Sequence, residues 1–118
     1  MSSFKAFFHK TRDGEQISYK INFSPKELKK DETVVVFNYG LVCSNHHWSK
    51  QLEHFSERGL KILVHDYRGH YLSSGDDKLE NITFQNIARD VSELLEQVRA
   101  ESCFMIGHSM GVNICLEF

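Results

Sequence analysis

The feature that most constrains the fold of this chain is the pentapeptide Gly107-His108-Ser109-Met110-Gly111. It follows Cys103 to Ile106, an apolar run typical of a buried strand, and precedes Val112 to Leu116, an apolar run expected to be helical. A chain that passes directly from strand to helix must turn sharply, and glycines permit such a turn because they have no Cβ. The pentapeptide therefore predicts a tight turn that exposes the Ser109 hydroxyl at the end of a sheet.

Gly-x-Ser-x-Gly between a strand and a helix is the pattern of a nucleophile elbow. A serine hydroxyl is a weak nucleophile, and it attacks an ester carbonyl when a histidine removes its proton and an acid orients that histidine. The alternative is that Ser109 merely caps the helix. Because motif and context agree, the catalytic interpretation is favoured.

The partners that such a serine needs are missing downstream. In hydrolases built on this elbow, the acid and the histidine follow the nucleophile along the chain. Between Met110 and Phe118 there is no histidine, and the only acid, Glu117, falls on the expected helix. We therefore expect the chain as it stands to be nearly inactive.

Composition restricts the classes of partner. With 118 residues, the chain suits one domain. Its net charge of -2 mixes both signs along the sequence and predicts binding neither to nucleic acid nor to an anionic membrane. No apolar stretch approaches the roughly 20 residues that cross a bilayer. The odd number of cysteines, Cys43, Cys103 and Cys115, favours a reducing, cytoplasmic location. We expect no cofactor.

The hydrophobic pattern predicts an α/β fold. Phe4 to Lys10 and Ile17 to Phe23 flank a tight-turn signal and are expected to form an antiparallel hairpin. Buried strands are predicted at Thr33 to Asn38, Leu60 to His65 and Cys103 to Ile106, with helices at 48–58 and 84–98 between them. Such alternation implies parallel strands with helices on both faces and a ligand site at their carboxyl ends.

Loops at the expected carboxyl ends contain other polar residues that we interpret as structural. Asp66 and Arg68 are expected to form an ion pair that holds their loop, since an acid that precedes the nucleophile breaks the usual order.

Histidines in the same loops are weaker candidates. His46 and His47 have no Cys or acidic partner at metal-ligand spacing, so we expect no metal site. His70 and His108 are conceivable surrogate bases, but we favour neither.

Three motifs in order resemble those of the α/β-hydrolases, the group that includes esterases, lipases and dehalogenases. They are the elbow, Asn38-Tyr39-Gly40-Leu41 in place of the oxyanion loop, and Asp66-Tyr67-Arg68-Gly69-His70. The resemblance implies that residues 1–118 are the amino-terminal part of a single α/β-hydrolase domain, truncated after the elbow. It also implies an oxyanion hole formed by the N–H groups of Leu41 and Met110. The chain departs from the family pattern at Tyr39, Tyr71 and Val112.

Two functions of different class follow. The first is a lipase-like serine esterase that forms an acyl-enzyme with a small ester or acyl substrate, its acid and histidine lying in sequence not given. The second is a non-catalytic α/β fragment or binding module. In either case the strand Cys103 to Ile106 is expected to be an exposed edge. We therefore predict that the isolated chain is poorly soluble, dimerises through this edge, or is a piece of a longer product.

Overall fold

A five-stranded mixed sheet organises residues 4–118, the part of the chain that the computed structural model describes. Its strands lie in the order β1-β2-β4-β3-β5 and are β1 (Lys5–Lys10), β2 (Gln16–Ile21), β3 (Thr33–Asn38), β4 (Lys61–His65) and β5 (Ser102–Gly107). Strands β1 and β2 form an antiparallel hairpin, β2 pairs antiparallel with β4, and β3 pairs parallel with both β4 and β5. The predicted hairpin and parallel strands are confirmed.

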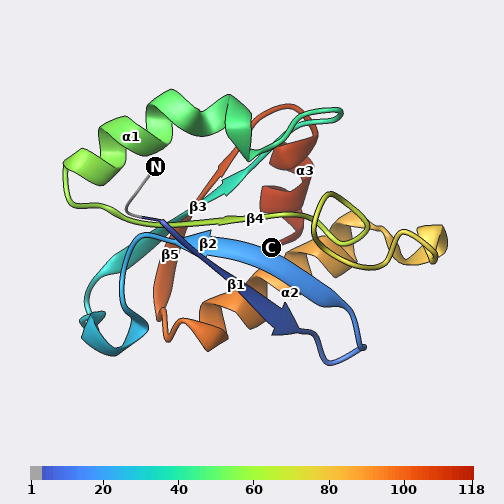
Figure 1. Cartoon of the computed structure of the whole chain (residues 1–118), viewed down its shortest axis with the longest axis horizontal. Helices are drawn as coiled ribbons and strands as arrows, with labels where there is room; N and C mark the ends of the chain where they lie inside the picture. The colour runs from blue at the N-terminus through green and yellow to red at the C-terminus, as the bar shows by residue number, and fades with distance from the viewer. Residues whose placement is uncertain (1–3) are drawn as a thin grey trace.

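Helices cover both faces of this sheet (Figure 1). They are α1 (Ser49–Glu57), α2 (Phe84–Gln97) and α3 (Met110–Glu117), with short 3₁₀ helices η1 (Pro25–Glu27), η2 (Asn45–Trp48) and η3 (Leu79–Asn81). Helix α2 begins where predicted, because the Thr83 hydroxyl accepts a hydrogen bond from the Asn86 N–H at 3.1 Å. The α/β class expected from the sequence is therefore confirmed.

Alternation along the central strands produces a core on each side of the sheet. One cluster joins Val34 and Val36 of β3 to Val91 and Leu94 of α2. The opposite cluster joins Val35, Phe37, Ile62 and Val64 of the sheet to Leu52 of α1. Strands buried on both faces need continuous apolar sequence, which is why these segments are rich in valine, leucine and isoleucine.

Three connections leave the carboxyl ends of the parallel strands, at the upper right of Figure 1. They are the segment after β3, the long loop after β4, and the turn from β5 into α3. The β3 and β4 loops contact each other directly, because the Tyr71 hydroxyl donates to the Cys43 carbonyl at 2.6 Å. This edge of the sheet is the place that the topology gives to a ligand site.

The predicted Asp66–Arg68 ion pair is wrong. Arg68 instead donates two hydrogen bonds to Asp90 of α2, at 2.7 and 2.8 Å, and two to Asp13 in the hairpin turn, at 2.9 and 3.1 Å. Asp66 accepts from the Leu72 N–H at 3.3 Å. Arg68 keeps a structural role, but it connects its loop to the hairpin turn and to α2 rather than to Asp66.

Candidate active site

Ser109 occupies the turn between β5 and α3 and is exposed to solvent. Its backbone has φ 56° and ψ −120°, which is an unfavourable region for a residue with a Cβ. Non-glycine residues held in such conformations concentrate at functional sites. The predicted sharp turn is present, and Ser109 is exposed in it.

The two glycines of the motif are needed for space. A Cβ on Gly107 would lie 2.6 Å from the carbonyl carbon and oxygen of Gly111, and a Cβ on Gly111 would collide with the carbonyl oxygen of Asn38. Neither glycine has a positive φ, so close approach rather than backbone freedom requires them. The elbow therefore packs tightly against the end of β3.

The loop after β3 lies directly beside Ser109. A Cβ on Gly40 would lie 3.0 Å from the Ser109 Cβ, so Gly40 places the following residue next to the elbow. The Cys43 N–H donates to the Gly40 carbonyl at 3.1 Å, closing a turn in which Val42 has φ 59°. Within residues 4–118, neither the Leu41 N–H nor the Met110 N–H donates to another group. Two free donors thus belong to the segments that meet at Ser109.

Tyr39 stands where the family pattern that the chain resembles usually has a histidine, and its side chain is buried in the core. Its ring stacks on that of Tyr67 with centroids 4.0 Å apart. The Tyr67 N–H donates to the Tyr39 hydroxyl at 2.9 Å, and the Tyr67 hydroxyl donates to the Tyr39 carbonyl at 2.7 Å. Burial raises the pKa of both phenols, so they stay protonated. Tyr39 therefore fastens the β3 loop to the β4 loop.

No triad partner contacts Ser109 in the described part of the chain: its hydroxyl has no hydrogen-bond partner among residues 4–118. The His108 ring packs edge-to-face with Trp48, at 6.5 Å between centroids. The His70 Nδ1 lies 3.0 Å from the Arg68 carbonyl, and Glu117 lies on α3. Within residues 4–118, Ser109 is thus presented without a base.

His46 and His47 lie in η2, where the Ser44 hydroxyl accepts from the His46 N–H at 3.2 Å. The His47 Nδ1 accepts from the Ser44 N–H at 3.1 Å, so this ring caps its own turn. Among residues 4–118, no group of three or more His, Cys, Asp or Glu side chains is placed to hold a metal ion. Both residues thus form hydrogen bonds with Ser44, at most three positions away in the chain.

Two residues beside the site were given no role of their own from the sequence. Asn38 and His65 are the last residues of β3 and β4, and both are buried. The His65 Nε2 lies 3.0 Å from the Asn38 Oδ1. The sequence did contain a signal for them, because Asn38 and His65 are polar residues at the ends of two apolar runs. Neighbouring parallel strands end side by side, so the two polar side chains could be expected to lie close together.

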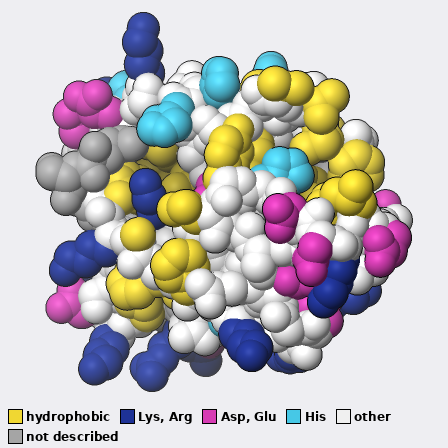
Figure 2. All heavy atoms as spheres, turned by 45° about the vertical axis from the view of Figure 1, so that its right-hand side comes forward, with side chains coloured by type: hydrophobic (Ala, Val, Ile, Leu, Met, Phe, Trp, Pro, Cys, Tyr) yellow, Lys and Arg dark blue, Asp and Glu magenta, His cyan; other side chains and the backbone are white. Residues whose placement is uncertain are grey.

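The surface at this end of the sheet carries exposed apolar side chains. Figure 2 shows hydrophobic and histidine side chains gathered on the upper part of this side of the molecule. Exposed apolar residues in the loops include Leu41, Val42, Tyr71 and Leu72. A hollow of about 200 Å³ opens beside Gly40, Trp48 and His108. Apolar groups of a small molecule would find contacts here.

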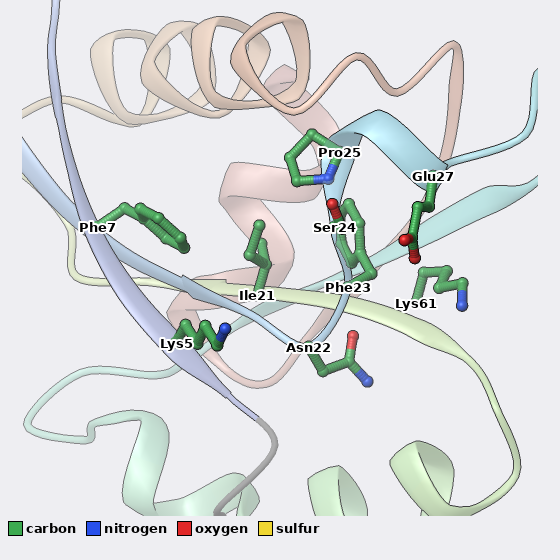
Figure 3. Close-up of a pocket in the computed structure, with 9 residues that line it drawn as sticks. All are labelled: Lys5, Phe7, Ile21, Asn22, Phe23, Ser24, Pro25, Glu27 and Lys61. Carbon is green, nitrogen blue, oxygen red and sulfur yellow. The ribbon is translucent and has the colours of Figure 1, made fainter.

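A larger hollow, of about 400 Å³, lies elsewhere (Figure 3). Its lining includes Lys5 of β1, Ile21 at the end of β2, and Lys61 at the start of β4. The amino end of β4 is opposite to the edge that carries Ser109. The larger hollow is therefore separate from the candidate active site.

Comparison with known proteins assigns the chain to a family. Residues 33–118 match the family model described as the alpha/beta hydrolase fold. The chain is 30% identical over 101 residues to a bifunctional esterase/perhydrolase of Acinetobacter calcoaceticus, covering 86% of this chain and 34% of that protein. It is 34% identical over 101 residues to a non-heme chloroperoxidase of Streptomyces lividans, with the same coverage of 86% and 34%.

Solved structures agree in fold. An epoxide hydrolase of Vigna radiata superposes with a TM-score of 0.80 at 18% identity, covering 98% of this chain and 33% of that one. A putative aryl esterase of Burkholderia cenocepacia gives 0.75 at 24% identity, covering 91% and 38%. The chain thus spans about a third of these proteins. On its sequence and its fold, the chain belongs to the alpha/beta hydrolase family.

Proposed function

We propose that this protein is a serine hydrolase of small carboxylic esters and that Ser109 is its nucleophile. The observation that carries the proposal is the strained, exposed serine of the elbow, beside two segments with unused N–H donors. A turn with a purely structural role gains nothing from holding a hydroxyl-bearing residue at φ 56°. A nucleophile does, because the strain lifts the hydroxyl clear of the sheet.

The proposed reaction has two halves. The Ser109 Oγ bonds to the ester carbonyl carbon while its proton passes to a histidine, and the Leu41 and Met110 N–H groups stabilise the resulting oxyanion. Collapse breaks the bond to the leaving alkoxide, which takes the proton from that histidine and departs as an alcohol. Water then attacks the acyl-enzyme by the same route, releasing the acid and restoring the serine.

The base and the acid are assigned to sequence outside residues 4–118. This part of the proposal is supported by the coverage of the relatives, of which the chain spans 34% in the first two cases. A histidine reaching the Ser109 Oγ would find that hydroxyl free of other hydrogen bonds from residues 4–118. Glu117 is not proposed as the acid, because it lies on α3, beyond the turn that presents the serine.

An ester substrate is favoured by the names of two relatives. One is the esterase/perhydrolase mentioned above, and another, 29% identical over 111 residues, is a 3-oxoadipate enol-lactonase of Acinetobacter baylyi. A lactone is a cyclic ester, so both names describe attack on the same kind of carbonyl. The hollow of about 200 Å³ beside Gly40 exceeds the roughly 150 Å³ cavity that holds benzene in another protein. It suits a small acyl or aryl group.

A cytoplasmic location is part of this proposal. Cys43, Cys103 and Cys115 are all unpaired, as is usual in a reducing compartment. Among the described residues, no helix is both long and apolar enough to pass through a bilayer.

A second candidate function is a non-catalytic binding module. It is favoured by one observation, namely that no base contacts the Ser109 hydroxyl within residues 4–118. Such a module would bind a small molecule at the same loops, or a partner at the edge strand β5.

Ester hydrolysis by serine variants separates the two functions. For the full-length protein acting on p-nitrophenyl acetate, we expect Ser109→Ala to lower kcat by at least roughly 10³-fold, because the acyl-enzyme no longer forms. Ser49→Ala is the matched control, since Ser49 is an exposed serine at the start of α1. Equal activity in both variants would contradict the proposal.

A further inference from the structure

Asn38, at the end of β3, contacts the elbow on both sides of Ser109, at His108 and at Gly111. Its side chain is fully buried, with 0% exposure. Its backbone carbonyl accepts from the His108 N–H at 3.2 Å, and its Nδ2 donates to the Ile106 carbonyl at 3.1 Å. The same carbonyl touches Gly111 at the start of α3. The Asn38 backbone therefore contacts the residues on both sides of Ser109, while its side chain holds the end of β5 that leads into them.

His65 fixes the orientation of that asparagine. The Asn38 Nδ2 donates to a carbonyl, so the Oδ1 faces the His65 Nε2 and accepts its hydrogen at 3.0 Å. This contact requires a proton on Nε2, as the neutral Nε2–H tautomer provides. Burial lowers the pKa of His65 to about 4, which agrees with a neutral ring. The Nδ1 is buried without a partner in the described residues, so the contact with Asn38 is the one side-chain hydrogen bond of His65 there.

The pair is well placed to set the geometry of the nucleophile. Phe37 pairs with Val64 across β3 and β4, so the residues that follow, Asn38 and His65, end side by side. Across β5, Asn38 pairs with Gly107. A rotation of the Asn38 amide would release the Ile106 carbonyl and shift the strand that leads into Ser109. Catalytic geometry tolerates little of this, because a displacement of about 1 Å can cost roughly 10²-fold in rate.

Building on the proposed role of Ser109, we propose that the buried Asn38–His65 pair is a positioning unit that holds the nucleophile elbow against the oxyanion loop. Asn38 is the positioning residue, and His65 acts through it. Neither side chain has to touch the substrate. The elbow motif determines the shape of the turn, and the Asn38–His65 pair determines where this turn lies relative to Gly40 and Leu41.

Asn22 provides a matched control at the other end of the sheet. Its Oδ1 accepts from the Ile62 N–H at 2.7 Å, and its Nδ2 donates to the Leu60 carbonyl at 2.9 Å. Asn22→Leu thus removes a similar set of backbone-anchoring hydrogen bonds from the hairpin end, far from Ser109 along the strands. The same substitution at Asn38 removes the hydrogen bonds to the Ile106 carbonyl and to His65, next to the elbow, and leaves the backbone contacts in place.

The test measures kcat and KM for p-nitrophenyl acetate with the full-length protein, at a temperature where both leucine variants are folded by circular dichroism. We expect Asn38→Leu to lower kcat by roughly 10- to 100-fold with KM nearly unchanged, because misplacement affects the transition state most. Asn22→Leu should retain kcat. His65→Phe should behave like Asn38→Leu, whereas His65→Gln should recover most of the rate, since its amide can donate to the Asn38 Oδ1.

A second readout does not depend on activity. Amide hydrogen exchange of residues 107–111 should be faster in Asn38→Leu than in Asn22→Leu. Equal kcat and equal exchange in the two variants would overturn the proposal, as would loss of rate in His65→Gln equal to that in His65→Phe. If Asn38→Leu does not fold, the proposal is tested by comparing kcat of His65→Phe with kcat of His65→Gln. If the wild type hydrolyses no ester, the proposed function fails, and exchange at 107–111 alone decides the positioning role.

Discussion

Two backbone N–H groups, those of Leu41 and Met110, give the residues around Ser109 their proposed chemistry. Met110 is the first residue of α3, and the first N–H groups of a helix have no intrahelical partner. Leu41 is the second residue of the turn closed by Gly40 and Cys43, in which φ is positive at Val42 and not at Leu41. This is the pattern of a type II turn, whose second position accepts proline.

That geometry permits a precise deletion of one donor. Leu41→Pro should remove the N–H without straining the turn, and we expect kcat for ester hydrolysis to fall by roughly 10²- to 10³-fold because the oxyanion loses a hydrogen bond. Leu41→Ala is the control, since it keeps the N–H and trims only an exposed side chain. Steady-state kinetics of the full-length variants decide it. A proline variant as active as the alanine variant would exclude Leu41 from the oxyanion hole.

Among the elements, the β1–β2 hairpin, the β4 loop and α2 are joined by a single guanidinium. The side chain of Arg68 is only 3% exposed, and it donates to Asp13 of the hairpin turn and Asp90 of α2. Its hydrogen bonds lower the pKa of Asp13 to about 2. Burial raises the pKa of Asp90, against the opposing effect of Arg68. The Asp13 contribution to stability is thus present above about pH 4 and is lost as the pH falls towards 2.

Removing this guanidinium should destabilise the whole fold. We expect Arg68→Met to lower the free energy of unfolding by about 3–5 kcal/mol, because Asp90 would be left buried without its partner. Arg12→Met removes the exposed ion pair with Glu96 and should cost less than about 1 kcal/mol. Urea denaturation monitored by circular dichroism measures both. If the two variants proved equally stable, Arg68 would not be a main link between these elements.

Most elements were predictable because each depends on local sequence. The runs 33–38 and 60–65 are mostly apolar, and α2 shows one apolar face after a capping threonine, so the strands and the helix are evident from the sequence pattern. The contacts of Arg68 were not predictable in the same way, because Asp13 and Asp90 lie 55 and 22 residues away. The Asn38–His65 contact likewise depends on the register between β3 and β4. The sequence of either strand alone does not determine that register.

In the candidate site too, the features of one short segment could be predicted, and the contacts between segments could not. Ser109 and its glycines were predicted because the turn imposes a local requirement for small residues on both sides of the serine. The replacement at Tyr39 could be noticed in the sequence, but its stacking on Tyr67 depends on how two loops meet. Chemistry carried by one short segment was therefore accessible, and chemistry assembled between segments was not.

At the scale of the whole molecule, the two edges of the described sheet differ in charge. Strand β1 contains Lys5 and Lys10, and charged side chains discourage pairing with another edge. Strand β5, Ser102–Gly107, contains no charged residue, and its Phe104 is 65% exposed. We therefore propose that the 118-residue chain self-associates through β5 rather than through β1.

A charge placed on each edge tests this choice. Phe104→Lys should shift the 118-residue chain towards the monomer, because pairing at β5 would bury the new ammonium group. Phe8→Lys is the matched control on β1, where Phe8 is 56% exposed, and it should leave association unchanged. Sedimentation velocity over a range of concentrations reports the outcome. Equal dissociation by both variants, or a wild type that stays monomeric, would contradict association through β5.

The most direct test of the account is the reaction of the full-length protein with a fluorophosphonate, which labels a serine only when its hydroxyl is activated. Peptide mapping by mass spectrometry would locate the label, with Ser109→Ala and the denatured wild type as controls. We predict stoichiometric phosphonylation of Ser109 in the folded wild type and none in either control. A folded full-length protein that leaves Ser109 unmodified would contradict the assignment of Ser109 as nucleophile and favour the binding module.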